Sequence, residues 1–256
     1  MKKNDIIKAL SRLTPLACLG FWVGVWWVAA LLLGKPLLLP TPWQTLKTLW
    51  ALLKTAPFWQ ALLFSFLRIF GGIAAAFLLG VWLALLTAKF RALHHLISPL
   101  MNLFQSVPVA SIVFLLLLFI GRDTAPFFMA LMPTLPIVWS NMEAGLCSTD
   151  EKLLEMARVF DVKKSAVFWH VRFQGALPFL GAACRSAIGL GFKAGVAAEV
   201  LCVPTRSLGR AIYESKLYLH TNELFATTLA VILLSMAIEK LTLLLLPKEE
   251  KDVNTK

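Results

Sequence analysis

Residues 61–88 read ALLFSFLRIFGGIAAAFLLGVWLALLTA, an apolar run whose single charge is Arg68. About 20 helical residues cross the hydrocarbon core of a bilayer, so this run is long enough to span it. The whole chain is similar in character, with 59% hydrophobic residues, 15% charged residues and a mean hydropathy of +0.76. Soluble domains carry about 25% charged residues. Since no region alternates as a barrel strand would, we expect an all-α integral membrane protein.

Further apolar runs lie on both sides of this one. Together they predict about six transmembrane helices, near residues 15–33, 61–88, 96–120, 125–142, 176–203 and 224–246. We expect a single transmembrane domain over residues 15–246, with a cytoplasmic N-terminus at 1–14 and a cytoplasmic tail at 247–256.

The placement of lysine and arginine predicts the orientation, because cytoplasmic loops carry an excess of both. With the N-terminus inside, the inner segments hold twice as many of these residues as the outer segments. We therefore expect both termini in the cytoplasm and the chain in the inner membrane. The net charge of +11 does not indicate a nucleic-acid partner, because the positive residues lie at the ends of apolar runs.

Two segments outside the predicted spans have helical patterns. Pro40–Trp59, on the outer side, places Trp43, Leu46 and Leu53 at helical spacing, as in helices that lie at a membrane surface. Packing against the spans is the alternative. The loop at 143–175 is the longest cytoplasmic segment.

This loop contains two helical patterns. Glu151–Phe160 has an apolar face, and we expect Ser148 or Thr149 to cap its start. Lys164–Phe173 predicts a second amphipathic helix. Such a pair, held between two spans, is well placed to dock a cytoplasmic protein. A solvated loop on the membrane surface is the alternative.

The residues of this loop resemble a known pattern. Glu155-Met-Ala157, Phe160-Asp161, Phe168, Val171 and Pro178 resemble the cytoplasmic "EAA" loop of ATP-binding cassette (ABC) importer permeases. The resemblance covers roughly residues 35–245 and points to the nitrate/sulfonate/taurine branch of binding-protein-dependent type I importers. The residues that carry it elsewhere are Leu39-Pro-Thr-Pro42, Trp59, Ser65, Arg68, Gly72, Pro108, Pro136, Ala176-Leu-Pro178, Arg185, Gly189, Ala198-Glu199-Val-Leu201, Leu208-Gly209 and Thr221.

This resemblance implies a type I importer permease fold, similar to that of methionine importers, with a cytoplasmic coupling helix. It implies three partners: an ABC ATP-binding subunit, an extracytoplasmic substrate-binding protein and a second copy of the chain. In that family the coupling helix sits in a cleft of the ATP-binding subunit. Small anions such as sulfonates or nitrate are the implied substrates, and small nitrogen heterocycles remain open.

Two positions depart from the family pattern. Asp161 and Gln174 stand where the EAA loop usually has Gly and Pro. The Gly would end the coupling helix in a left-handed conformation, which Asp tolerates less well than Gly but better than most residues. We interpret Asp161 as a modified cap.

The coupling residues predicted by pattern and resemblance together are Glu155, Ala157, Phe160, Asp161 and Val162. Apolar side chains would dock, and Glu155 and Arg158 would orient the helix through ion pairs.

Charged residues inside spans are candidates for the translocation path, because they usually face protein or water. They are Lys193, Arg185, Glu199 and Arg68. One hypothesis is that Lys193 meets an anionic substrate. The alternative, which we favour, is that these charges pair with other spans or with a second copy, Arg68 being a candidate partner for Glu199. Lys193 points about 100° away from the helix face shared by Arg185 and Glu199.

Small residues and prolines predict close helix packing and kinks. Gly71, Gly72, Gly80, Gly189, Gly191 and Gly195 would let helices approach closely. Pro108, Pro133 and Pro136 would kink the third and fourth spans.

Other classes of function fit less well. We expect no catalytic residue, metal ligand or bound cofactor, because no HExxH motif, paired carboxylates or metal-like cysteine spacing is present. A Gly-rich phosphate loop is also absent, so a partner must bind the ATP. A self-contained channel or secondary transporter is the remaining alternative, although no internal repeat supports it.

Overall fold

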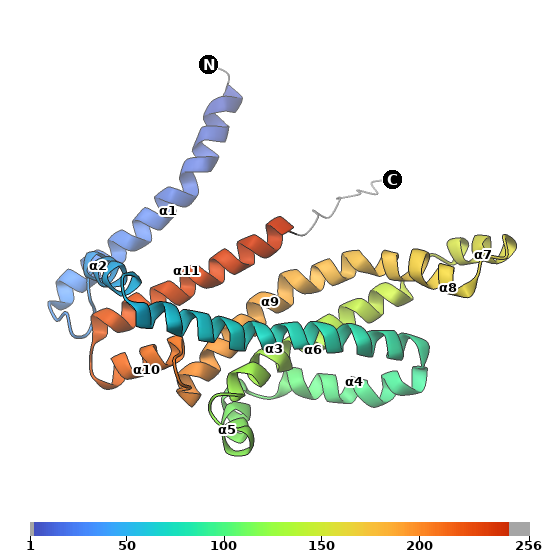
Figure 1. Ribbon diagram of the computed structural model, residues 1–256. Helices are drawn as coiled ribbons and strands as arrows, with labels where there is room; N and C mark the ends of the chain where they lie inside the picture. The colour runs from blue at the N-terminus through green and yellow to red at the C-terminus, as the bar shows by residue number, and fades with distance from the viewer. Residues whose placement is uncertain (1–2, 246–256) are drawn as a thin grey trace. The chain divides into compact units, whose positions relative to one another are not determined.

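The computed structural model describes the backbone of residues 3–245 and the side chains of residues 17–108 and 110–244. These residues form helices and no strands, which confirms the all-α class. The helices are α1 (Lys3–Leu33), α2 (Pro42–Leu53), α3 (Ala56–Lys89), α4 (Arg91–Ser106), α5 (Val109–Ile120), α6 (Ala125–Cys147), α7 (Glu151–Val159), α8 (Lys164–Val167), the π-helical η1 (Phe168–Phe173), α9 (Gln174–Cys202), α10 (Leu208–Leu217) and α11 (Thr221–Leu245) (Figure 1). The predicted tail 247–256 and the last residue of the predicted sixth span lie outside the described residues.

The predicted third span, 96–120, is not one continuous helix, and the kink predicted at Pro108 is a break. It divides into α4 and α5, which meet at an angle of 108°. Pro108 lies at the break as the residue that caps α5. It supplies no backbone N–H, and it disfavours a helical conformation at Val107. By contrast, α6 runs through Pro133 and Pro136 without a break.

Several predicted boundaries also change. Trp59 belongs to α3 and not to the outer amphipathic helix, which is confined to α2. Thr41 and Gln44 form a reciprocal capping box at the start of α2, which fixes where that helix begins. The predicted second loop helix, Lys164–Phe173, is not separate. It continues through η1 into α9, so that one helical path runs from Lys164 to Cys202.

Length and composition support only part of the predicted span count. Within the described residues, three helices are long and apolar enough to cross a membrane, or four if α4 and α5 form one broken span. The 23-residue α6 is about 35 Å long at 1.5 Å per residue. If α6 and the apolar stretch Ala17–Leu33 also cross the membrane, the four spans become six. The number six remains a prediction.

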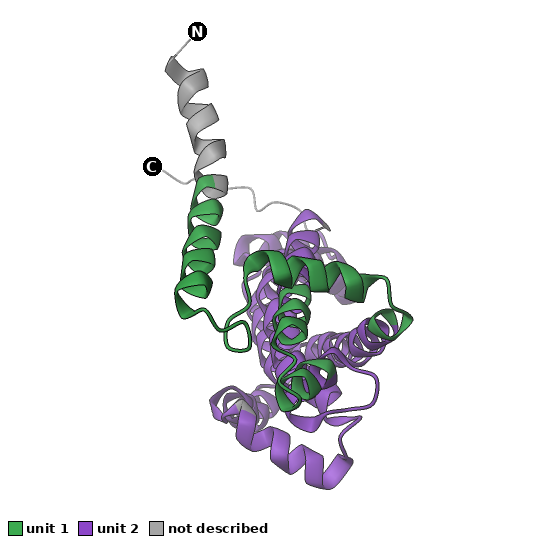
Figure 2. Cartoon of the chain, turned by 90° about the vertical axis from the view of Figure 1, so that its left-hand side faces the viewer, with its two compact units in different colours: residues 1–59, 211–230 green, residues 60–210, 231–256 purple. Residues whose placement is uncertain are grey.

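The chain forms two compact units (Figure 2). The first contains residues 1–59 and 211–230. In this unit the Trp26 indole donates a hydrogen bond to Pro40 O at 3.1 Å and stacks on Phe225. The Thr221 hydroxyl donates to Leu37 O at 2.6 Å. These contacts join α1 and the segment before α2 to the start of α11.

The second unit contains residues 60–210 and 231–256, and its most extensive helix pair is α6 with α9. Glycines make close packing possible here, as the sequence predicted. A Cβ at Gly195 of α9 would lie 2.8 Å from Ile69 of α3, and one at Gly80 of α3 would lie 2.8 Å from Val138 of α6. No side chain larger than hydrogen fits at either position. The glycines therefore set how closely α3, α6 and α9 approach.

Candidate functional site

The short helix α7 is defined at its start by Asp150. The Asp150 side chain accepts a hydrogen bond from Lys152 N at 3.0 Å, which makes Asp150 the N-cap. The prediction of Ser148 or Thr149 as the cap is wrong. Their hydroxyls instead donate to Gly145 O and Leu146 O, at the end of α6. Asp150 also places a negative charge at the positive end of the α7 dipole.

The end of α7 has the left-handed cap that was predicted at Asp161. Asp161 has φ of +51°, in the left-handed region. Val162 N donates to Ala157 O at 2.9 Å and Asp161 N donates to Arg158 O at 3.1 Å. These two bonds form a Schellman motif, which usually has glycine at the left-handed position. Asp161 therefore occupies a glycine conformation.

The second departure, at Gln174, also has a visible consequence. Gln174 N donates to Val171 O across the end of η1, a bond that proline cannot make. Gln174 thus adds a backbone hydrogen bond at the junction of η1 and α9.

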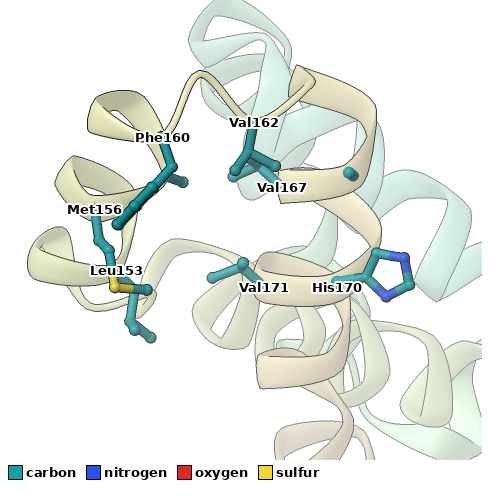
Figure 3. Close-up of a pocket in the computed structure, with 9 residues that line it drawn as sticks. Leu153, Met156, Phe160, Val162, Val167, His170 and Val171 are labelled. Carbon is teal, nitrogen blue, oxygen red and sulfur yellow. The ribbon is translucent and has the colours of Figure 1, made fainter.

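Between α7 and the following helix lies an apolar pocket of about 260 Å³. Leu153 and Met156 of α7, and Phe160 at its C-cap, face Val167 and Val171 across it (Figure 3). His170 points away (Figure 3). Phe160 is nevertheless 74% exposed. An apolar pocket beside an exposed aromatic ring is a surface suited to a protein partner.

The predicted coupling residues are not all in one environment. Ala157, Phe160 and Val162 all line the apolar pocket. Of these three, Ala157 is buried, whereas Phe160 and Val162 are exposed. Glu155 lies on the solvent side of α7 and lines no described cavity. Neither Glu155 nor Arg158 forms an ion pair with another described residue, so the predicted orienting ion pairs are not made within the described part of the chain.

Among the charged span residues, Arg68 and Glu199 form a pair, as the sequence suggested. Arg68 Nη1 lies 3.2 Å from Glu199 Oε1, and the Glu199 side chain is 0% exposed. The Ser65 hydroxyl donates to Glu199 Oε2 at 2.6 Å. Ser65 in turn accepts from Leu208 N at 2.9 Å, and Gly209 N donates to Glu199 Oε2 at 3.3 Å. Three hydrogen bonds offset the burial of this carboxylate, and one of them comes from the opposite charge of Arg68.

The Arg68 guanidinium extends this network to two connecting segments. Its Nη2 donates to Thr205 O at 3.2 Å and lies 3.6 Å from Asp123 Oδ1. Thr205 donates to Asp123 Oδ1 from both its N–H and its hydroxyl, each at 2.8 Å. Partial burial, the largest single influence, raises the pKa of Asp123, but the Thr205 bonds and the charges of Arg68 and Arg122 together hold that pKa below its usual value.

Lys193 has a different partner, which the sequence analysis missed. Its Nζ lies 2.8 Å from Glu239 Oε1 on α11, and the two side chains are 63% and 42% exposed. Glu239 lies inside the predicted sixth span, 224–246, but was not among the charged residues singled out as candidates. An acidic residue inside a predicted span is a signal from which Glu239 could have been identified as a partner for Lys193. Gly189 packs against the same carboxylate, since a Cβ there would lie 2.9 Å from Glu239 Oε1.

The four charged candidates therefore do not meet at one point. Arg68 and Glu199 share one network, Lys193 pairs separately, and half-buried Arg185 lies farther along α9 with interactions of its own. The residues of α9 that carry these groups follow the predicted helix geometry, with Glu199 on a buried face and Lys193 on an exposed one.

Within the described residues, one buried ion pair joins α3 and α9, and the exposed amphipathic helix α7 lies in the loop between α6 and α9. Charges placed in this way are common in membrane transporters. Residues 76–248 match the family described as binding-protein-dependent transport system inner membrane components. The chain belongs to this family and is a permease subunit of an ABC importer.

Named relatives agree with this assignment. The chain is 27% identical over 239 residues to the taurine transport system permease protein TauC of Escherichia coli strain K12, covering 90% of this chain and 86% of the relative. It is 25% identical to a probable ABC transporter permease protein of Brucella melitensis biotype 1, covering 90% and 95%. It is 26% identical to the putative aliphatic sulfonates transport permease protein SsuC of E. coli K12, covering 72% and 70%.

Proposed function

We propose that this permease works with a separate ATP-hydrolysing subunit and that α7 is its coupling helix. The observation that carries the proposal is the exposed Phe160 ring beside the apolar pocket of α7. The Schellman motif at Asp161 fixes the direction in which the chain leaves α7. Force applied to α7 would pass through Val162 into the continuous helical path that becomes α9.

The experiment is a co-purification of the ATP-binding subunit with tagged permease variants. Phe160→Glu replaces the exposed docking ring with a charged side chain, so the ATP-binding subunit should be lost from the purified sample. Because Phe160 is exposed, the fold should remain intact. Lys152→Glu is the matched control, because it changes the charge of the same helix at a residue that lines no described cavity. Equal recovery of the ATP-binding subunit with all three proteins would contradict the coupling role of α7.

We also propose that the Lys193–Glu239 pair faces a water-filled path formed with a second copy of this chain. The proposal is supported by the exposure of both side chains within apolar helices, since charges inside membrane spans face protein or water. Arg68 and Glu199 have all their charges matched inside the chain, so we assign them a structural role at one end of the path.

A charge exchange separates pairing from substrate contact at Lys193. If the pair only holds α9 to α11, Lys193→Glu combined with Glu239→Lys should restore the uptake that either single change removes. If Lys193 contacts an anionic substrate, the exchanged pair should stay inactive. The substrates in the relatives' names, taurine and aliphatic sulfonates, favour a small anion for this chain as well, delivered by an extracytoplasmic binding protein.

The proposed orientation places both termini and α7 in the cytoplasm. Cys147 is exposed at the end of α6, close to α7. A membrane-impermeant maleimide should therefore label Cys147 in inside-out vesicles and not in intact cells. The reverse pattern would invert the topology.

A further inference from the structure

A second and larger cavity, of about 1310 Å³, lies between the end of α3 and the segment that follows α7. Trp82, Leu85 and Leu86 of α3 and Phe168 of η1 give it an apolar wall. Its basic lining residues come from three segments, and they are Lys89, Arg158, Lys163, Lys164 and Arg172. Asp161 is the single acidic residue of the lining. The cavity therefore combines an apolar wall with a strong excess of positive charge.

The positive charge of this cavity is not neutralised by the chain itself. All five basic side chains are exposed, and none forms an ion pair with a carboxylate of the described residues. Lys89 Nζ lies over the Phe90 ring at 5.1 Å, which positions the ammonium without neutralising it. A cluster of this kind attracts an anionic group.

The apolar wall continues along α3 into the membrane-spanning part of the helix. Leu78, Trp82 and Lys89 follow one another at helical spacing on its surface, and Leu78 and Trp82 are 75% and 57% exposed. This stripe ends in a lysine at the last turn of α3. An apolar stripe that ends in positive charge matches a lipid, which has acyl chains next to a charged headgroup.

The cavity uses a different face of α7 from the docking pocket. Leu154, Arg158 and Asp161 line the large cavity, whereas Leu153, Met156 and Phe160 line the small pocket. Only residues at the boundary, such as Ala157, are shared. A ligand in the cavity therefore leaves Phe160 available to the ATP-binding subunit.

We propose that this cavity binds an anionic phospholipid of the cytoplasmic leaflet, with its phosphate among the basic residues and an acyl chain along Trp82 and Leu78. The choice of leaflet rests on the orientation given under the proposed function, which the labelling of Cys147 tests independently. Headgroup binding itself depends on neither the orientation nor the ATP-binding subunit.

The test is native mass spectrometry of the full-length chain in detergent, delipidated and then titrated with phosphatidylglycerol or phosphatidylcholine of the same acyl chains. The wild-type chain should prefer phosphatidylglycerol. Lys163→Gln with Lys164→Gln should weaken phosphatidylglycerol binding about fivefold for each charge removed, with little effect on phosphatidylcholine. Lys47→Gln on α2 with Lys54→Gln at its C-cap is the matched control and should change neither. Trp82→Ala should weaken both lipids.

Three results would overturn the proposal. One is equal binding of the two lipids by the wild-type chain, or an equal loss in the α2 control. Another is displacement of phosphatidylglycerol by millimolar inorganic phosphate with no effect of Trp82→Ala, which would indicate a site for a free anion. The third is displacement of the bound lipid by the ATP-binding subunit, which would make this surface a protein interface.

Discussion

Arg68 and Glu199 lie 131 residues apart in the sequence, yet Arg68 Nη1 and Glu199 Oε1 are 3.2 Å apart. Their contact joins α3 to the last turn of α9. Through Ser65 and Gly209 it also fixes the start of α10. Because the Glu199 side chain is fully buried, this carboxylate depends on its partners.

Removing either member of this pair should destabilise the protein. Arg68→Ala should lower the free energy of unfolding by about 3–5 kcal/mol, because it leaves a buried charge unpaired. Glu199→Gln should have a smaller effect, and the double variant should lose less than the sum of the two. Unfolding by sodium dodecyl sulfate titration in mixed micelles measures these differences. Strict additivity of the two changes would show that the pair is not coupled.

Gly209 should not tolerate a side chain. A Cβ at this position would collide with Glu199 Cβ, so Gly209→Ala should destabilise the protein by about 1–3 kcal/mol. Gly175 on α9 is the matched control, since nothing lies within 4 Å of its Cβ position. Gly175→Ala should be neutral or stabilising by about 0.5–1 kcal/mol. The same titration compares them, and an equal response of both sites would refute the close approach at Gly209.

The left-handed conformation at Asp161 predicts an unusual order of stability. Asp161→Gly should stabilise the end of α7 by about 0.5–1 kcal/mol, because glycine adopts φ near +51° without strain. Asp161→Val should destabilise it by about 1–2 kcal/mol, since a β-branched residue is strained there. Hydrogen exchange at Val162 N–H, which bonds to Ala157 O, reports this order. Faster exchange in the glycine variant than in the valine variant would contradict it.

The pH dependence of stability should reveal the contribution of Asp123, through its contacts with Thr205 and Arg68, to the free energy of unfolding. Its pKa is lowered from the usual 3.8 by the Thr205 bonds and by Arg68 and Arg122, against the opposing effect of partial burial. A carboxyl whose pKa is lowered by folding contributes stability above its unfolded pKa and loses it as pH falls through the folded value. The stability difference between wild type and Asp123→Asn should thus stay constant from pH 8 to about pH 5 and disappear only under pH 3.8. A difference that already shrinks between pH 7 and pH 5 would rule out this assignment.

The sequence predicted some features because they depend on local pattern. Apolar runs and helical periodicity located α3, α7 and α9, and helix geometry correctly separated the directions of Lys193 and Glu199. The sequence predicted a kink at Pro108 but not that it would be a break of 108°. A proline alone does not determine how far a helix bends, and α6 continues through Pro133 and Pro136. The sequence also did not predict Glu239 as the partner of Lys193, since that choice depends on how α9 packs against α11.

The capping of α7 shows a further limit. Asp150, Ser148 and Thr149 are all good N-cap residues, so composition alone does not choose among them. The choice follows from where α6 ends, because Ser148 and Thr149 use their hydroxyls on the final carbonyls of that helix. Only the three-dimensional path of the chain settles which side chain is left for α7.

We propose that this chain transports solute only together with a separate ATP-hydrolysing subunit docked on α7. The most direct measurement is the mass and composition of the complex that forms around the tagged, gently solubilised protein in its native host. We predict two copies of this chain with two ATP-binding subunits, and loss of those subunits in Phe160→Glu but not in Lys152→Glu. A chain that purifies alone and moves solute without ATP would contradict the account.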